Sequence, residues 1–302
     1  MNGEGEIRDR LLHVADLHFW RVVLDPFALL NKRFLGNLNV AVRRRHEFAM
    51  HRAEAFTGAL EATGIPSVLF TGDFTSTSTD AEFAMARAFV DRVRGRGMAP
   101  IVLPGNHDVY TFEAHRARRF ERHFNGLLPE HGYPSLTTLP GGTPVILVPT
   151  VTPTALSSRG AIRPEQILAA AALLDQCRGP VIVAAHYPLL HRTPSYASRP
   201  GRRLRNAQAL RAMLGASGRT ILYVCGHVHQ FSHLKDPDFP ALEHLSTGAF
   251  FRNDRHKGTQ GEFSEVHVKE SGFQVFHHVN AGTWTRTTSF PQALTRAPIP
   301  AP

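Results

Sequence analysis

The distribution of hydrophobic residues predicts a chain in which short buried strands alternate with helices. Apolar runs with little polar interruption lie at 11–15, 66–70, 99–103, 181–185 and 221–225. Short apolar runs bounded by turn residues are typical of strands that are buried on both faces, as in parallel sheets. These five runs are therefore expected to form the interior of an α/β fold.

The segments between these runs place apolar residues at helical spacing. Helices are predicted over 43–63, 79–93, 112–124, 164–177 and 206–214. Thr79 and Glu82 have the spacing of a capping box, Pro164 suits a first helical position, and Asn206 is expected to cap the last helix. A helix between two strands returns the chain to the same end of a parallel sheet, so crossover connections are expected.

Further strands are predicted in the second half of the chain. They cover 136–139, 145–148, 241–250, 264–268 and 272–278, and the last two form a hairpin. The last three are expected to close the sheet at its far edge. Several prolines lie in 290–302, which we expect to be a disordered tail, and residues 1–289 are expected to form one domain.

Each of the five buried runs is followed by side chains of the types that bind metal ions. These are Asp16 and His18, then Asp73, then Asn106, His107 and Asp108, then His186, and finally His227 and His229. Because the carboxyl ends of parallel strands share one edge of a sheet, these side chains are expected to converge. Any one motif alone is weak, since Asp16 and His18 would equally fit a turn aspartate and a surface histidine.

Together, these side chains supply the ligands of a two-metal site, which needs mixed oxygen and nitrogen donors and a bridging carboxylate. One grouping gives Asp16, His18 and His229 to one ion and Asn106, His186 and His227 to the other, with Asp73 between them. A water shared by two cations is the expected nucleophile, because the cations lower its pKa. His107 is expected to protonate or stabilise the leaving oxygen, while Asp108 would either orient that imidazole or cap a local turn.

Composition narrows the setting of this chemistry. Lys and Arg number 34 against 25 Asp and Glu, and the net charge of +9 either attracts anionic partners or only reflects an arginine-rich composition. Two cysteines, Cys177 and Cys225, indicate neither a disulfide framework nor a thiolate zinc site. The first ten residues lack the apolar core of a signal peptide, and no run approaches the roughly 18 apolar residues of a membrane span. We expect a cytoplasmic protein, at most peripheral at the inner face of the membrane.

Two basic segments each leave two interpretations open. Residues 19–45 mix aromatic and aliphatic side chains with arginines, so they could dock in a membrane interface or pack as a lid. Arg192, Arg199, Arg202 and Arg203 lie in a loop beyond a strand end, where α/β folds bind substrates. The alternative is a solvated basic loop.

The motifs, in this order, resemble those of the calcineurin-like metallophosphoesterase superfamily. They are Asp16-x-His18, Gly72-Asp73, Gly105-Asn106-His107-Asp108, His186 and Gly226-His227-x-His229. The resemblance implies a four-layer αββα sandwich of two mixed β-sheets flanked by helices, with the ligand roles given above. It implies two divalent metal ions as cofactors, manganese, iron or zinc, with manganese favoured. Ala185 replaces a common glycine and Thr75 a common acidic or amide residue, but neither departure removes a ligand.

Within that superfamily, the 19–45 segment and the runs 71–75 and 106–110 are similar to bacterial enzymes that cleave the pyrophosphate of UDP-2,3-diacylglucosamine in lipid A synthesis. This resemblance implies hydrolysis of a phosphodiester or pyrophosphate bond in a phosphate-containing small molecule or lipid nucleotide. A cyclic AMP phosphodiesterase and a catalytically silent binding scaffold are the alternatives. A nucleic-acid partner is not expected, because no basic groove interleaved with aromatic residues is visible beyond the loop 191–205.

Overall fold

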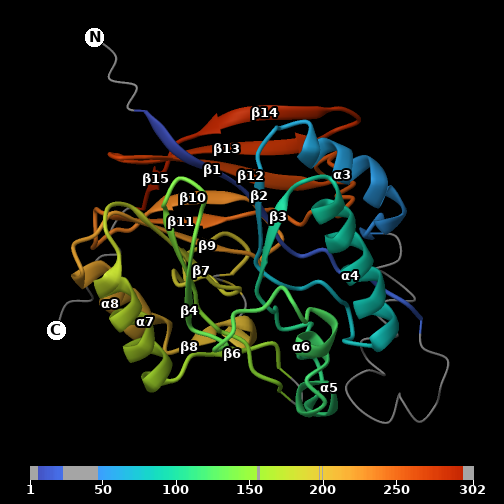
Figure 1. Cartoon of the computed structure of the whole chain (residues 1–302), viewed down its shortest axis with the longest axis horizontal. Coiled ribbons are helices and arrows are strands. Elements are labelled where there is room, and N and C mark those ends of the chain that lie inside the picture. The colour runs from blue at the N-terminus through green and yellow to red at the C-terminus, as the bar shows by residue number, and fades with distance from the viewer. Residues whose placement is uncertain (1–5, 23–46, 155–156, 197, 199, 295–302) are drawn as a thin grey trace.

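Two β-sheets pack face to face in this protein, and helices cover the outer face of each sheet (Figure 1). The computed structural model describes residues 6–22, 47–154, 157–196, 198 and 200–294. Within these residues the layers follow the order helix, sheet, sheet, helix. The predicted αββα sandwich with two mixed sheets is therefore confirmed.

The first sheet has six strands with a parallel part that leads to the site. Its order is β14 (Trp284–Ser289), β13 (Gly272–Asn280), β12 (Glu262–Lys269), β1 (Ile7–Val14), β2 (Ser67–Phe70) and β3 (Ala99–Val102). β1, β2 and β3 are parallel, whereas β12 runs antiparallel to β1. The carboxyl ends of β1, β2 and β3 consequently lie at one edge.

The second sheet has seven strands and a similar parallel centre. Its order is β15 (Gln292–Ala293), β10 (Ser232–Lys235), β11 (Leu242–Ser246), β9 (Ile221–Cys225), β7 (Val181–Ala184), β5 (Pro144–Leu147) and β4 (Ser135–Thr138). β11, β9, β7 and β5 are parallel neighbours. A separate pair, β6 (Gly160–Ala161) and β8 (Leu204–Arg205), lies in the loops of this half.

The helices divide between the two outer faces. On the first sheet lie α3 (Ala53–Glu61) and α4 (Asp80–Gly95), with α5 (Phe112–Arg116) and α6 (Arg119–His123) beside α4; on the second lie α7 (Pro164–Gln176) and α8 (Ala207–Ala216). Short 3-10 turns occur at Met50–Arg52 and Pro200–Arg202. In Figure 1, α3 and α4 stand on the opposite side of the sheets from α7 and α8.

Burial on both faces explains why the strands read as continuous apolar runs. In β1, Leu11 packs between the sheets, whereas its neighbour Leu12 packs against the α3 and α4 layer. In β9, Leu222 likewise points between the sheets and Tyr223 toward α7 and α8. Successive side chains of a strand alternate between its two faces, so Leu11–Val14 of β1 and all of β9 are buried.

Three expectations about the elements were wrong. The predicted helix 112–124 is two short helices, because Arg118 adopts a left-handed backbone with φ 48°. The strands predicted at 241–250 and 264–268 do not close one edge together, since β11 belongs to the second sheet and β12 to the first. Asn206 precedes α8 but makes no side-chain cap; its amide donates to the carbonyl of Ile162 at 2.9 Å.

The ends of the predicted domain also need correction. Within the predicted tail, Gln292–Ala293 form β15 and pair with β10, so order extends past residue 290. Residues 295–302, and residues 23–46 of the apolar basic segment, lie outside the described residues. Among the helices that the structure describes, none has the length and apolarity needed to cross a membrane.

Loops at the carboxyl ends of both sheets are joined by hydrogen bonds into one rim. In the first sheet, the Asp16 amide donates to the Gly72 carbonyl at 3.0 Å, and in the second, the Gly226 amide donates to the His186 carbonyl at 3.2 Å. Across the two sheets, the His227 amide donates to Asp16 Oδ1 at 3.1 Å. The rim therefore brings together residues that are more than two hundred positions apart.

Candidate metal centre

Five of the seven candidate ligands lie on left-handed backbone, where residues other than glycine are uncommon. They are Asp16, His18, Asp73, His227 and His229, with φ between 50° and 72°. Each such conformation costs on the order of 1–3 kcal/mol and persists only where the surroundings impose it. Hydrogen bonds between the loops hold two of these turns, since the amides of Asp16 and His18 donate to the carbonyls of Gly72 and Asp73 at 3.0 and 2.9 Å.

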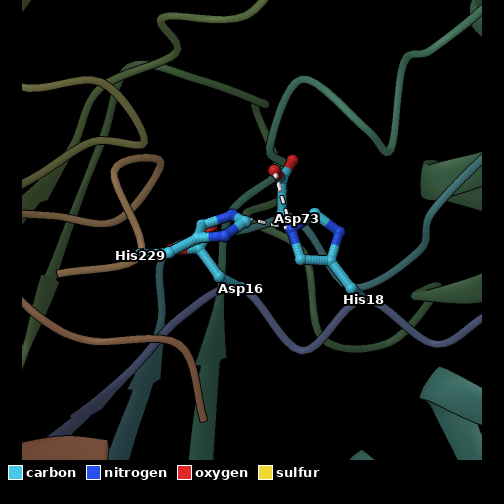
Figure 2. A group of neighbouring side chains, drawn as sticks. All are labelled: Asp16, His18, Asp73 and His229. Carbon is cyan, nitrogen blue, oxygen red and sulfur yellow. Dashed lines mark hydrogen bonds and ion pairs between the residues drawn. The ribbon is translucent and has the colours of Figure 1, made fainter. Parts of the chain in front are cut away.

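The first group of candidate ligands contains Asp16, His18, Asp73 and His229, whose donor atoms all lie within 4.8 Å of one another. His18 Nε2 is 2.9 Å from His229 Nε2 and 3.6 Å from Asp73 Oδ2, and His229 Nε2 is 3.7 Å from Asp16 Oδ1. Figure 2 shows the four side chains pointing toward one another from separate segments. The two carboxylates and His18 are buried, and His229 is partly exposed.

The second group contains Asp73, His186 and His227, again within 4.8 Å. Asn106 joins them, because its Oδ1 lies 3.0 Å from His186 Nε2 and 2.9 Å from His227 Nδ1. His186 Nε2 is 3.5 Å from Asp73 Oδ1. Asp73 is thus shared by both groups, one oxygen facing each.

Backbone carbonyls determine which nitrogen faces the centre for three of the imidazoles, those of His18, His186 and His227. The Nδ1 atoms of His18 and His186 lie 3.2 Å and 2.8 Å from the carbonyls of Thr75 and Thr71. His227 uses its other nitrogen, with Nε2 3.1 Å from the Arg202 carbonyl. A carbonyl only accepts hydrogen bonds, so the ring nitrogen next to the carbonyl carries the proton. The other nitrogen of the same ring then presents its lone pair to the centre.

This arrangement fits a pair of divalent cations. Burial lowers the pKa of His186 to about 4, and burial followed by the neighbouring His186 lowers the pKa of His227 well below its usual value. Both imidazoles are therefore neutral, the form that binds metals. The Asp73 carboxylate can only accept hydrogen bonds. The nitrogens of His186 and His18 that lie 3.5 and 3.6 Å from it also present lone pairs, so acceptors face acceptors here. Such facing acceptors repel one another unless a cation lies among them, and mixed oxygen and nitrogen donors suit manganese, iron or zinc.

Two glycines let the loops of Asp73 and Asn106 pack backbone against backbone. A Cβ at Gly72 would meet the Gly105 nitrogen at 2.2 Å, and a Cβ at Gly105 would meet the Asp73 nitrogen at 2.1 Å. Gly72 also has a φ of 88°. The close approach brings the shared carboxylate next to the amide ligand, so these glycines are part of the construction of the site.

A cavity of about 160 Å³ opens beside the two groups. Its wall includes Asp73, Asn106, His227 and His229 of the candidate ligands. It also contains Glu47, Phe48, Ser195, Tyr196, Arg202 and Arg252. A molecule bound in this cavity would contact the candidate ligands directly.

Comparison with protein families places the chain. The family model described as calcineurin-like phosphoesterase matches residues 9–231, most of the sequence. The chain belongs to the calcineurin-like phosphoesterase family. Membership makes this protein a metal-dependent phosphoesterase. A search of curated proteins found no significant match.

Two solved structures share the fold of this phosphoesterase at low sequence identity. A dimetal phosphatase from Danio rerio is 12% identical with a TM-score of 0.62, and the match covers 94% of this chain and 99% of that one. A purple acid phosphatase from yellow lupin (Lupinus luteus) seeds is 12% identical with a TM-score of 0.60, covering 96% of this chain and 54% of that one. The phosphoesterase chain thus spans about half the length of the lupin protein. At this identity the likeness shows the fold alone.

His107 stands beside the ligand groups of the phosphoesterase and lines the cavity. Its backbone amide donates to Asp73 Oδ1 at 2.7 Å, and its Nδ1 lies 2.7 Å from the Ser76 carbonyl. The ring stacks on Tyr110, with centroids 5.2 Å apart and planes at 13°. These contacts assign the ring proton to Nδ1, which donates it to the Ser76 carbonyl, and Nε2 is the nitrogen on the opposite side of the ring.

Asp108 is buried in the phosphoesterase and bonds to backbone rather than reaching into the cavity. Its carboxylate accepts from the amides of Gly105 at 2.8 Å, Phe74 at 3.2 Å and Thr75 at 2.9 Å, and from the Thr75 hydroxyl at 3.0 Å. Burial, and then the charge of Asp73, raises the pKa of Asp108 to about 7. Of its two predicted roles these contacts favour the turn anchor, which ties the Asp73 loop to the Asn106 loop.

The structure separates the arginines that were predicted to bind substrate. Arg202 lines the cavity, whereas the described wall contains neither Arg192 nor Arg203. Arg199 lies outside the described residues. The sequence analysis missed Arg252, because the strand predicted through residue 250 ends at Ser246. β11 is parallel to β9, so the segment after Ser246 reaches the same rim, and a shorter strand assignment would have revealed it.

Proposed function

We propose that this phosphoesterase hydrolyses a phosphodiester or pyrophosphate bond with two divalent cations held by seven side chains. Asp16, His18 and His229 would hold one cation, Asn106, His186 and His227 the other, and Asp73 would bridge them. The observation that carries the proposal is that Asp73 faces a carbonyl-oriented imidazole on each side, at 3.6 and 3.5 Å. Bound cations would supply an activated water molecule and neutralise phosphate oxygens.

The remaining residues of the site have positional and proton-transfer roles in this proposal. His107 would transfer a proton from Nε2 to the leaving oxygen, because Nδ1 already donates its own proton to the Ser76 carbonyl. Protonation of a leaving group by a positioned imidazole contributes about a hundred- to ten-thousand-fold in rate. Asp108 and Thr75 hold the His107 loop, since the single Thr75 hydroxyl proton lies within hydrogen-bond distance of both the His107 carbonyl and the Asp108 carboxylate.

For the substrate, we propose a UDP-2,3-diacylglucosamine-like pyrophosphate first and cyclic AMP as the alternative. The sequence resemblance supports the first, and a membrane-docking role for residues 19–45 belongs to it. Four residues of that segment are described, and they run from a buried Phe19 to Val22, which is 36% exposed. Manganese is the proposed native ion. A side-by-side turnover screen of the two substrates separates them.

Metal content and turnover test the proposal independently. Manganese-reconstituted protein is expected to bind about two ions per chain and to hydrolyse bis(p-nitrophenyl) phosphate. Asp73→Ala should lose both properties, whereas His107→Ala should keep the metal and lose turnover. The matched controls Asp175→Ala and His115→Ala replace exposed residues and should behave as the unmodified chain.

Two outcomes would remove the proposal. One is a chain that binds no metal at saturating manganese, as a catalytically silent scaffold would. The other is full turnover in Asp73→Ala, which would mean that the bridging carboxylate is not required.

A further inference from the structure

Two arginines lie in the cavity wall, and each contacts one of the two ligand groups. Arg252 Nη1 donates to the carbonyl of His229, a residue of the first group, at 3.2 Å. The carbonyl of Arg202 accepts from His227 Nε2, in the second group, at 3.1 Å. Both arginines therefore belong to the wall of the cavity, one next to each ligand group.

Arg252 is held in place by its surroundings. Its Nη2 lies 3.6 Å from Asp254 Oδ2, and the Asp254 carboxylate is itself tied to the amide of His256 at 3.1 Å. The backbone of Arg252 forms an antiparallel bridge with Phe48, whose ring packs edge-on against His18 at 4.7 Å. A guanidinium has five N–H donors in a fixed fork; the His229 carbonyl accepts from one of them, while Asp254 is close enough only for an ion pair. The fork is thus oriented and retains donors for a ligand in the cavity.

The residues of the cavity wall other than the candidate ligands carry a net positive charge. Outside the seven candidate ligands the wall contains Arg202, Arg252 and Glu47, whose side-chain charges sum to +1. Asp254 offsets part of the Arg252 charge, but it is not among the residues of the wall. A guanidinium binds phosphate oxygens through paired charge-assisted hydrogen bonds, and its attraction for a phosphate group grows with the negative charge of that group.

We infer that Arg202 and Arg252 make this site select substrates whose reacting phosphate carries two negative charges or has a second phosphate next to it. The inference rests on the proposed function. A simple or cyclic phosphodiester carries one negative charge, which two cations at the ligand groups already balance. A terminal phosphate or a pyrophosphate adds a further charge for the two guanidiniums. Both arginines are specificity-determining residues in this account.

A matched pair of chromogenic esters tests the selectivity. p-Nitrophenyl phosphate and bis(p-nitrophenyl) phosphate release the same product but differ by one charge on phosphorus. With the manganese-loaded full chain, the ratio of their kcat/KM values should fall about 10- to 100-fold in Arg252→Gln, the loss of a charged hydrogen bond. Arg252→Lys should retain part of the ratio, because it keeps the charge but not the fork. Arg255→Gln, an exposed neighbour outside the wall, should leave the ratio unchanged.

Two nucleotide substrates separate the sources of the second charge. Wild-type turnover of ADP in preference to UDP-glucose would identify a terminal phosphate, and the reverse preference would identify an internal pyrophosphate. Either result supports the inference, whereas preference for cyclic AMP over both contradicts it.

An unchanged ester ratio in Arg252→Gln with normal manganese content would overturn the inference. If Arg252→Gln loses manganese through its contact with His229, the ratio in Arg202→Gln decides instead, since that change keeps the carbonyl that holds His227. If the wild-type chain binds manganese and cleaves the diester, but the variants have the same ratio of kcat/KM values for the two esters, only the inferred selectivity is wrong. A wild-type chain that cleaves neither ester sinks the proposed function.

Discussion

Replacing Gly105 by alanine should separate the two loops that carry Asp73 and Asn106. The new Cβ would lie 2.1 Å from the Asp73 nitrogen and 2.2 Å from Asp73 Oδ1. Ordinary contacts between heavy atoms need about 3.5 Å, so the loops must separate by on the order of 1 Å. Gly105 does not have a positive φ, so the effect is steric and involves no unfavourable backbone dihedral.

The cost of this separation follows from what the two loops share. Overpacking of a well-packed interior costs roughly 1–3 kcal/mol of unfolding free energy. The shift also disturbs the hydrogen bond from the His107 amide to Asp73 Oδ1, now 2.7 Å long. A misplacement of about 1 Å in a reacting constellation reduces the rate about a hundredfold. We therefore expect Gly105→Ala to lose both stability and turnover, and to bind manganese less tightly.

Urea unfolding, manganese titration and bis(p-nitrophenyl) phosphate turnover measure these effects. Gly58→Ala is the matched control, because Gly58 lies inside α3 and a Cβ there meets nothing within 4 Å. The free energy of unfolding of Gly58→Ala should rise by about 0.5–1 kcal/mol, since alanine is the better helix former. Unaltered unfolding free energy and manganese affinity in Gly105→Ala would show that the loops tolerate separation and that the reasoning is wrong.

Two further predictions concern stability away from the cavity. Burial alone would raise the pKa of Glu265, but the hydrogen bonds led by Arg286 hold that pKa well below its usual value. The stability that the Glu265 carboxylate contributes is therefore present above about pH 4.3 and is lost as the pH falls. Glu265→Gln should lower the free energy of unfolding by about 1.5–3 kcal/mol at pH 7. It should also narrow the difference in unfolding temperature between neutral and acid pH, and an equal difference in both proteins would contradict this. Thr79→Ala removes the hydroxyl that accepts from the Glu82 amide at the start of α4, and urea unfolding should show a loss of about 1 kcal/mol, whereas no loss would mean that Glu82 alone suffices as a cap.

Much of the fold was predictable because a buried strand is visible in the sequence as a short run of neighbouring apolar residues. Leu11 and Leu12 point to opposite faces of β1 and both are buried, which agrees with the covered strand predicted from the short apolar run that contains them. Thr79 and Glu82 form the predicted capping box of α4. By contrast, the break at Arg118 and the β10–β15 pair had no local signal, because a left-handed residue and an edge strand are imposed by packing.

The sequence by itself determined which chemical groups are available and that each follows a buried strand, since donor types and apolar runs are properties of neighbouring residues. Only the tertiary structure decided which strands share a sheet, which nitrogen of each histidine faces the centre, and that Asp108 bonds to the loop of Thr75. The same holds for Arg252, which reaches the cavity because β11 lies beside β9. These features depend on groups far apart in the chain whose hydrogen bonds form only after both sheets have packed, so no stretch of sequence contains them.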